Sequence, residues 1–326
     1  MDFTFSDEQE ALRASVRGFL RDRYPIERVA GIADGDGFDR SEWRWVADQG
    51  WIGISVPEQD GGAGLSFLDE IVVVEEMGRA LYPGPYLSGV ILGIAAACAG
   101  SHPRLRALVS GERIATVAWA GPDGRFDVDP APKVEYDEPN DLLTATKMFV
   151  PDLASADLLF VLGSSSDGTW LWWTDRDDPG LSWRELPTVD ATRRMGEVVF
   201  DHTPAWQLAG GPRPALRDRA LAALAVEAVG VGSAALDLAL GHARQREQFG
   251  KAIGSFQAVS HPLAQSFMEL ETARSLAYWA AWAVDQVAPE APAAAAAAKA
   301  RASEAAVSAC ERAIQAHGGI GFTWEH

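Results

Sequence analysis

REQFG, at residues 246–250, interrupts a carboxyl-terminal part of the chain that otherwise has an almost continuously helical pattern. A second unusual stretch, QAHGGIGF, occupies residues 315–322 and follows the last helical segment. Each stretch places polar side chains and glycine backbone where one helix ends and another segment begins. Helix termini with accessible backbone favour phosphate groups. The two stretches together therefore predict a site for a long, phosphate-bearing cofactor that lies across helix termini.

The segments around these two stretches predict a bundle of three long helices. Residues 216–246 form one helical segment of about 45 Å, with small residues such as Gly230 and Gly232 that let neighbouring helices approach. In the next segment, apolar residues recur in steps of three and four and predict one apolar stripe: Phe256, Val259, Leu263, Phe267 and Leu270. Pro292 and the alanine run 293–298 predict a third helix that ends at Gly318.

The preceding part of the chain divides into a helical block and a β block. Ser6 and Gln9 fit a capping box, and helical spacing continues around residues 42–50 and 67–81, with a loop at 56–64. Between residues 111 and 203, short runs rich in β-branched and aromatic residues predict strands at 114–119, 158–162, 170–174 and 198–200. The predicted fold is mainly α with a central β domain. Its domains are residues 1–110 (helical), 111–205 (β) and 212–326 (helical bundle).

Charge and composition limit the possible partners. The 46 acidic and 28 basic residues give a formal charge of −18, which argues against nucleic acid or an anionic membrane surface as the main partner. An anionic ligand needs a local basic patch, and residues 212–256 supply one. Cys98 and Cys310 are isolated, without metal-ligand spacing, and predict reduced thiols and no metal site. The acidic amino terminus and the short apolar run at 90–99 predict a cytoplasmic protein without membrane insertion.

The order of the blocks and three segments closely resemble the acyl-CoA dehydrogenase family. The segments are VPEQDGGAGLS at 56–66, REQFGKAIGSFQAV at 246–259 and QAHGGIGFTWE at 315–325, so the resemblance covers nearly the whole chain. It implies an amino-terminal helical domain, a small β-barrel or sandwich domain and a four-helix-type bundle. It also implies FAD at a subunit interface, where the bundle of one subunit completes the site of its neighbour.

The resemblance assigns cofactor-binding roles to the two stretches. It implies that Arg246 pairs with the FAD pyrophosphate and that Gln248 and Phe249 flank it. Further residues line the adenosine side or meet the adenine end: Ile253, Phe256 and Gln257 for the former, Gln315, Gly318 and Gly319 for the latter. A guanidinium holds a diphosphate through charge-assisted hydrogen bonds, and glycine lets backbone approach a ligand closely.

The family's catalytic base is absent from its usual places. In α,β-dehydrogenation of an acyl thioester, a carboxylate removes the α-proton while a hydride passes from the β-carbon to the flavin. The resemblance places that glutamate either early in the long helix, where this chain has Ala220, or well beyond the 315–322 stretch, where the sequence stops at His326. Glu227 is the nearest carboxylate on the helix, and we interpret it as an ordinary polar helix residue and a weak candidate base.

The β domain departs from the family pattern where it would contact the flavin ring. Residues 116–121 read TVAWAG in place of a segment rich in Thr and Ser, and residues 148–152 read MFVPD in place of an aromatic-Ile-Thr-Asn stretch. Pro151 has no N–H to donate. The half-site for this subunit's own flavin ring is therefore expected to be eroded, and the half-site offered to a partner is expected to be intact.

Two functions are compatible with this combination. The first is the short subunit of a heteromeric acyl-CoA dehydrogenase of α2β2 type, similar to actinobacterial enzymes that act on steroid side-chain CoA esters. A larger subunit would carry the glutamate, an acyl-CoA would be the substrate, and electron-transfer flavoprotein or a similar acceptor would take the electrons. The second is a homo-oligomeric flavoprotein with changed, oxygenase-like chemistry, or a non-catalytic binding protein of the same fold.

Overall fold

The structure is a computed structural model that describes residues 5–35, 37–126, 131–166, 168–208 and 213–323. Residues 1–4, at the start of the acidic amino terminus, and residues 324–325 of the 315–325 stretch lie outside this description. The chain packs into two compact units. The helical unit comprises Met1–Ile26, Phe67–Tyr82 and Leu221–His326, and the mixed unit comprises Glu27–Ser66 and Pro83–Ala220.

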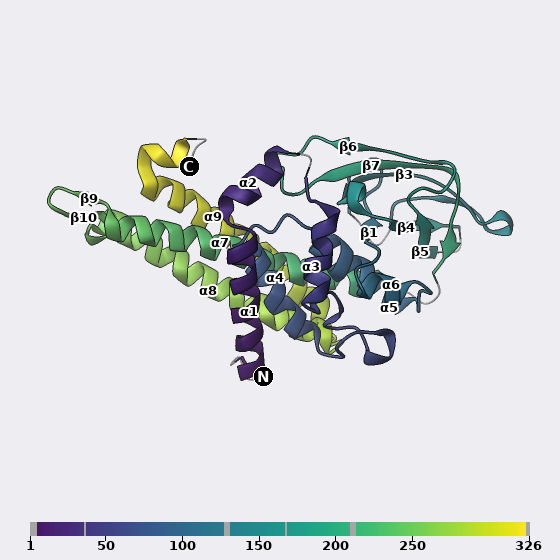
Figure 1. The fold of residues 1–326 in the computed structure, drawn as a ribbon, viewed down its shortest axis with the longest axis horizontal. Helices are drawn as coiled ribbons and strands as arrows, with labels where there is room; N and C mark the ends of the chain where they lie inside the picture. Colours follow the sequence, from purple (N-terminus) through teal and green to yellow (C-terminus); the bar gives the residue numbers. More distant parts are fainter. Residues whose placement is uncertain (1–4, 36, 127–130, 167, 209–212, 324–326) are drawn as a thin grey trace. The chain divides into compact units, whose positions relative to one another are not determined.

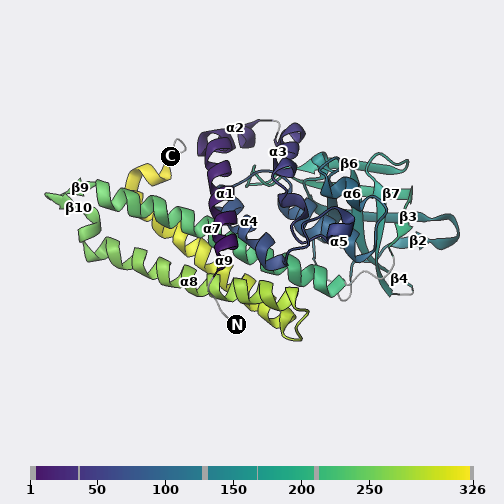
Figure 2. The ribbon, with the colours of Figure 1, turned by 60° about the horizontal axis from the view of Figure 1, so that its bottom comes forward.

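The helical unit contains the three long helices that the sequence predicts. They are α7 (Arg213–Gln245), which belongs to this unit from Leu221 onward, α8 (Gln257–Asp285) and α9 (Ala291–His317). They run side by side in Figures 1 and 2. Pro292 stands in the first turn of α9, and Gly318 ends it at a φ of 66°, as predicted. Glycine is favoured there because a Cβ strains a left-handed backbone.

Two amino-terminal helices complete this unit. Helix α1 (Asp7–Arg23) packs on α4 (Phe67–Arg79), and α4 packs on α8. The predicted capping box is confirmed, because Ser6 and Gln9 exchange side-chain and backbone hydrogen bonds of 3.1 and 3.2 Å. This box satisfies donors at the start of α1 that have no partner within the helix.

The predicted apolar stripe of α8 is wrong at one position. Leu263 and Leu270 are buried, but the Phe267 side chain is 56% exposed. The inward face of the helix instead follows Leu263, Ser266, Leu270, Ala273 and Ala277. Small residues occupy this face because α9 presents a row of buried alanines to its neighbours, which brings helices close together and leaves no room for a phenyl ring.

A buried carboxylate, Glu75, connects four helices of this unit. Arg13 of α1 donates to Glu75 from Nη1 (2.9 Å), and Arg274 of α8 donates from Nε (3.0 Å). The Tyr278 hydroxyl donates to the same carboxylate (2.7 Å), and Arg274 also reaches Ser233 of α7 (3.0 Å). Burial alone raises the pKa of Glu75, but the two guanidinium groups and the hydroxyl outweigh it, so the pKa lies below its ordinary value.

Helices α4 and α7 cross without side chains between them. A Cβ added to Gly230 would lie 2.2 Å from the Glu75 carbonyl oxygen, and one added to Gly78 would lie 2.4 Å from the Glu227 carbonyl oxygen. These distances are shorter than any van der Waals contact, so only glycine fits at either position. The crossing fixes α7 against the helix that carries Glu75.

The mixed unit combines short helices with two sheets. Its helical segments are α2 (Ile26–Asp34), α3 (Trp43–Asp48), a π-helix (Tyr86–Ile94), α5 (Ala95–Ala99) and α6 (Leu105–Val109). The apolar run predicted at 90–99 is therefore the end of the π-helix and the whole of α5. It packs against strand β1 (Ala115–Ala118), and most of its residues are buried in the core of this unit.

One sheet has the order β1-β4-β5-β8, and the other has the order β2-β3-β7-β6. Strand β1 is parallel to β4, and the other pairs are antiparallel. The strands are β2 (Glu135–Asp137), β3 (Leu142–Pro151), β4 (Leu158–Ser165), β5 (Gly168–Asp175), β6 (Leu181–Leu186), β7 (Met195–Pro204) and β8 (Trp206–Gln207). Inward residues of both sheets, among them Trp172, Leu143 and Phe200, form one core. All four predicted strands are confirmed.

The order of helices, strands and helices confirms the predicted fold class. The two compact units combine segments from different parts of the sequence, so the division into domains at residues 110 and 205 stays a prediction. Among the residues that the structure describes, one helix, the Ala215–Gln245 portion of α7, is long and apolar enough to cross a membrane by length and composition. Its buried face, with Ala222, Val226 and Val229 fully covered, identifies it as a core helix.

Lys147 of β3 is fully buried between the strands of the mixed unit. Its ammonium donates to the carbonyl oxygens of Leu162 and Trp119 and therefore connects β3 to β4 and to the residue after β1. Burial lowers its pKa to about 7, because the low-polarity surroundings disfavour the charged form.

The Gly230→Ala variant should be less stable than the wild type by about 3 kcal/mol, because the new Cβ overlaps the Glu75 carbonyl oxygen. Gly241→Ala in the same helix is the matched control, because no atom lies within 4 Å of its Cβ position. The control should be more stable by about 0.5–1 kcal/mol. Urea unfolding followed by circular dichroism measures both. Equal stabilities for the two variants would contradict the crossing described above.

The stability of the protein should rise with pH between about 7 and 10, because the unfolded chain retains a proton on Lys147 that the native state releases. The slope contributed by this lysine should reach at most about 1.4 kcal/mol per pH unit. Lys147→Met should remove that contribution, and Lys133→Met, at an exposed lysine, should keep it. If the unfolding free energies of all three proteins, measured in urea, changed with pH in parallel, that result would contradict the burial of the Lys147 ammonium.

Candidate functional site

The REQFG stretch folds as a two-stranded hairpin after α7. Strand β9 (Glu247–Gln248) pairs with β10 (Lys251–Ala252), and Phe249 and Gly250 form the turn with φ angles of 54° and 78°. Two left-handed residues in succession are typical of the tight turns that match the twist of paired strands. Figures 1 and 2 show this hairpin beyond the ends of α7 and α8. The stretch therefore projects from the end of the helical bundle.

Phe249 is unfavourably placed for an isolated chain. Its side chain is 92% exposed, and its positive φ is rare for a bulky residue. The ring meets Phe256 edge to face, at 6.1 Å between centroids, and the Lys251 Nζ lies 4.3 Å over the Phe256 ring. Strained backbone that carries an exposed aromatic side chain marks a binding surface more often than a structural one.

Arg246 lies at the junction of α7 and the hairpin. Its backbone N–H donates to the His242 carbonyl oxygen (2.8 Å), and its own carbonyl oxygen accepts from the Ile253 N–H (2.8 Å). These bonds fix the backbone on both sides. The guanidinium is exposed and has no ion pair or hydrogen bond with any part of the chain that the structure describes. Arg246 is therefore a cation on a held backbone, with all its side-chain donors available to a ligand.

The second stretch presents accessible backbone at the end of α9. Gln315 is exposed in its last turn, and Gly318 and Gly319 begin a 3-10 turn (Gly318–Phe322). No atom lies within 4 Å of a Cβ position at either glycine, so a ligand can approach both. The rings of His242 and His317 contact each other, with centroids 4.5 Å apart. The structure therefore brings the ends of α7 and α9, and with them the two stretches, together.

The remaining predicted cofactor residues lie on the return from the hairpin. Ile253 starts a 3-10 turn (Ile253–Ser255), Phe256 follows it, and Gln257 is the exposed first residue of α8. Gln248 is exposed in β9, and its side-chain amide donates to the Glu247 carbonyl oxygen (2.7 Å). The predicted residues from 246 to 257 therefore form one continuous surface segment.

The two positions considered for a catalytic base lie elsewhere. Ala220 precedes the part of α7 that belongs to the helical unit and carries no ionisable group. Glu227 is half-buried near the α4 crossing, about 27 Å along the helix axis from the end of α7 at Gln245. Neither position joins the cluster formed by the two stretches.

The two β-domain segments that the resemblance assigns to a flavin ring are bonded to each other. The Thr116 hydroxyl is buried and donates to the Pro151 carbonyl oxygen (2.6 Å). Met148 donates its N–H to the Ala120 carbonyl oxygen (3.1 Å), and Lys147 donates to the Trp119 carbonyl oxygen. These groups are committed within the fold, and Pro151 adds no donor. The segment around residues 148–152 therefore fits a flavin ring poorly.

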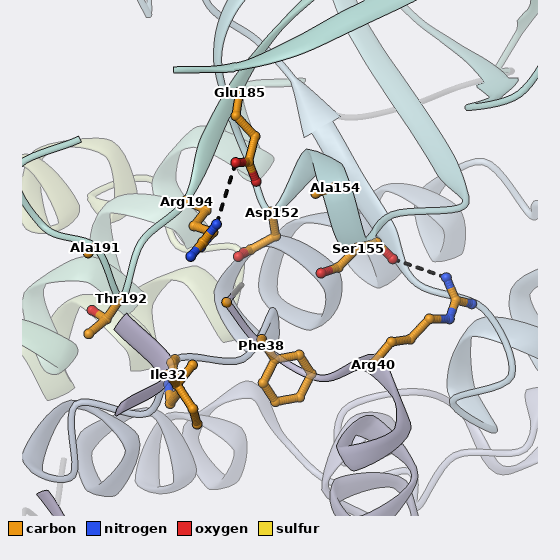
Figure 3. A pocket seen from close by; sticks show the side chains of 12 residues that line it. Ile32, Phe38, Arg40, Asp152, Ala154, Ser155, Glu185, Ala191, Thr192 and Arg194 are labelled. Carbon is orange, nitrogen blue, oxygen red and sulfur yellow. Dashed lines mark hydrogen bonds and ion pairs between the residues drawn. The ribbon is translucent and has the colours of Figure 1, made fainter. Parts of the chain in front are cut away.

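The mixed unit also contains a cavity of about 220 Å³, shown in Figure 3. Asp152, Arg40 and Arg194 lie on its wall, together with apolar side chains such as Phe38. Its cations already have partners, because Arg40 pairs with Asp157 and Arg194 with Glu185. None of the predicted cofactor residues lines this cavity. We assign it no role.

The donor set at the end of the helical unit fits the diphosphate part of a dinucleotide. It offers one uncommitted guanidinium, two exposed carboxamides (Gln248 and Gln315), and open glycine backbone. Arginine and backbone groups of this kind hold pyrophosphate, and an aromatic side chain such as Phe249 can cover the neighbouring sugar or base. The site thus fits one half of FAD, whereas the β-domain segments fit the other half poorly.

Sequence reasoning missed the two histidines that connect the stretches and the lysine that closes the β-domain segments. His242 precedes Arg246 by four residues, one helical turn, and His317 stands inside the second stretch. The signal that could have found them was their position in the sequence, close to the residues predicted to bind the cofactor. Lys147 gave no such signal, since a lone lysine in a strand usually faces solvent.

Comparisons with known proteins agree with the fold and with FAD as the cofactor. The family model described as acyl-CoA dehydrogenase, N-terminal domain, matches residues 6–101, and the one described as acyl-CoA dehydrogenase, C-terminal domain, matches residues 219–326. The acyl-CoA dehydrogenase IpdE2 of Mycolicibacterium smegmatis is 31% identical over 326 residues, which cover 98% of this chain and 90% of that protein.

Solved structures show the same similarity. A structure described as a variant of the Tcur3481-Tcur3483 steroid ACAD matches with a TM-score of 0.89 and 32% identity over 98% of this chain and 89% of that one. The ChsE4-ChsE5 complex from Mycobacterium tuberculosis matches with a TM-score of 0.91 and 28% identity over 100% of this chain and 90% of that one. Structures of this fold with FAD are also among the similar proteins, and FAD is the expected cofactor. The chain belongs to the acyl-CoA dehydrogenase family.

Proposed function

We propose that this chain is the base-lacking subunit of a heteromeric, FAD-dependent acyl-CoA dehydrogenase. In this proposal it donates the half-site for pyrophosphate and adenine to FAD that a larger subunit holds. The larger subunit carries the catalytic glutamate, and two copies of each subunit form an α2β2 heterotetramer. The substrate is an acyl-CoA thioester, which is desaturated between its α and β carbons.

The observation that carries this proposal is the uncommitted Arg246 guanidinium at the junction of α7 with the hairpin, three residues before the exposed Phe249. Phe249 lies in the hairpin at the end of the bundle and Arg246 directly precedes it, and the exposed phenyl ring is unfavourable unless another molecule covers it. The two carboxamides and open glycines nearby complete the set. A cofactor that is shared between two subunits requires such a set of accessible binding groups on the subunit that contributes them.

The assignment of the catalytic base and of the cofactor contacts to two different subunits follows from the residues at the candidate base positions of α7. Ala220 cannot take the α-proton of a thioester, and we interpret Glu227, half-buried near the crossing with α4, as an ordinary polar residue of α7. Bound FAD would supply the acceptor for the hydride from the β-carbon. The chain itself would hold the diphosphate charge with Arg246 and would exclude water from it with Phe249. The base and the contacts to the flavin ring are therefore assigned to the partner.

The names of similar structures support the finer details of this proposal. One is described as a steroid ACAD and another as a complex of two different chains. We therefore propose a steroid side-chain CoA ester as the substrate and a heteromeric assembly as the active form. An electron-transfer flavoprotein or a similar acceptor would then reoxidise the flavin.

Arg246→Ala should lower the affinity of the heteromeric complex for FAD at least tenfold, because the diphosphate loses its charge-assisted hydrogen bonds. The experiment co-expresses the chain with a glutamate-bearing larger subunit and titrates the apo complex with FAD, using flavin fluorescence. Arg244→Ala is the matched control, since Arg244 is also an exposed arginine near the end of α7. It should bind FAD within about twofold of the wild type.

Equal FAD affinity for the Arg246→Ala and wild-type complexes would contradict the proposed role. A homo-oligomer of this chain with one FAD for each protomer and oxygen-dependent activity would instead support the oxygenase-like alternative. Absence of FAD from every preparation, with or without a partner, would support a non-catalytic binding protein.

A further inference from the structure

The ends of α7 and α9 are joined by a pair of histidine rings. His242 and His317 lie with their ring centroids 4.5 Å apart and their planes 30° from parallel. His242 stands one turn before Arg246, and His317 stands between Gln315 and Gly318. The pair therefore connects the last turn of α7, just before the first stretch, to a residue inside the second stretch. No function has been assigned to it above.

The spacing of α7 and α9 explains why rings are needed at this place. Further back along the bundle, a Cβ added to Gly232 would lie 3.1 Å from the Ala306 Cα, so the two backbones almost touch. Ten residues later in α7 and eleven later in α9, two stacked rings stand between the same helices. Residue numbers rise along both helices from the Gly232–Ala306 contact to the His242–His317 contact, so α7 and α9 are parallel. The two rings fill the wider space between the ends of these helices.

His317 is held in place from its own helix. Its Nδ1 lies 2.7 Å from the Ala313 carbonyl oxygen, so the ring N–H donates to a backbone oxygen one turn earlier in α9. The following turn packs back on the same residue, because a Cβ added to Gly321 would lie 3.2 Å from the His317 Cβ. A shift of the His317 ring would therefore move Gly318 and Gly319.

His242 is connected to the other stretch in the same way. Its carbonyl oxygen accepts the backbone N–H of Arg246, so the last turn of α7 continues through both residues. The adjacent Ala243 packs against Gly254, whose Cβ position lies 3.0 Å from the Ala243 carbonyl oxygen. The turn that carries His242 therefore also positions the hairpin and the start of α8.

We propose that the His242–His317 ring pair is a clamp that sets the distance between the arginine stretch and the glycine stretch, so that one diphosphate-containing dinucleotide can contact both. The two histidines are positioning residues. This inference rests on the proposed function for the identity of the ligand, which is FAD. The clamp itself is a property of this chain alone.

The first test needs neither partner nor cofactor. Hydrogen–deuterium exchange of the isolated full-length chain should be at least tenfold faster at residues 313–322 in His242→Ala than in the wild type. His242→Phe keeps an aromatic ring and should exchange within about threefold of the wild type. His261→Ala, an exposed histidine of α8, is the matched control and should leave residues 313–322 unchanged. Unchanged exchange in His242→Ala would overturn the clamp.

The second test measures FAD affinity of the complex with the glutamate-bearing subunit, by flavin fluorescence. His242→Ala and His317→Ala should each weaken binding about tenfold, and the double variant should be no weaker than either, because both remove the same contact. His242→Phe should restore most of the affinity. Additive losses, or a failure of Phe to restore binding when Ala weakens it, would overturn positioning in favour of direct contact with the ligand.

The outcomes separate this inference from the proposed function. A wild-type complex without FAD would remove the proposed function, while the exchange experiment would still decide the clamp. FAD held equally by the wild type and both alanine variants would overturn the clamp and leave the shared cofactor intact. Circular dichroism spectra equal to that of the wild type ensure that each variant is folded.

Discussion

The helical unit depends on one buried carboxylate, Glu75, and on the glycine that packs against its backbone. Two arginines and a tyrosine from α1 and α8 hold the carboxylate, and Gly230 of α7 touches its carbonyl oxygen. A buried charge of this kind is tolerated only when its partners are all in place, since losing one costs about 3–5 kcal/mol. Glu75 therefore specifies the arrangement of four helices and makes α7 a rigid support.

The carboxyl-terminal end of α7 presents the groups that the proposed shared cofactor would contact. Helix α7 ends at a hairpin with an uncommitted arginine and an exposed phenylalanine, and α9 ends beside it with open glycine backbone. The mixed unit contrasts with this end, because Thr116, Met148 and Lys147 use their donors within the fold. Of the two groups of residues that the family resemblance assigns to FAD, those at the end of the helical unit are thus accessible, and those of the β domain are bonded within the fold.

Much of this could be read from the sequence, because the decisive patterns are local. Helical spacing, the Ser6 cap and the glycines at 318–319 predict their elements from neighbouring residues alone, and REQFG predicts the arginine at the helix end. The burial of Glu75 and Lys147 could not be read, because their partners come from distant segments. Phe267 was misplaced for the same reason: the alanine row of α9 decides which face of α8 is buried.

The most direct test of the central claim is the flavin stoichiometry of the purified complex. Native mass spectrometry and flavin absorbance of this chain with its larger partner measure the number of FAD molecules for each subunit. The account predicts one FAD for each pair of unlike subunits, and little FAD on this chain expressed alone. One FAD for each protomer of the isolated chain, with dehydrogenation of an acyl-CoA, would contradict it.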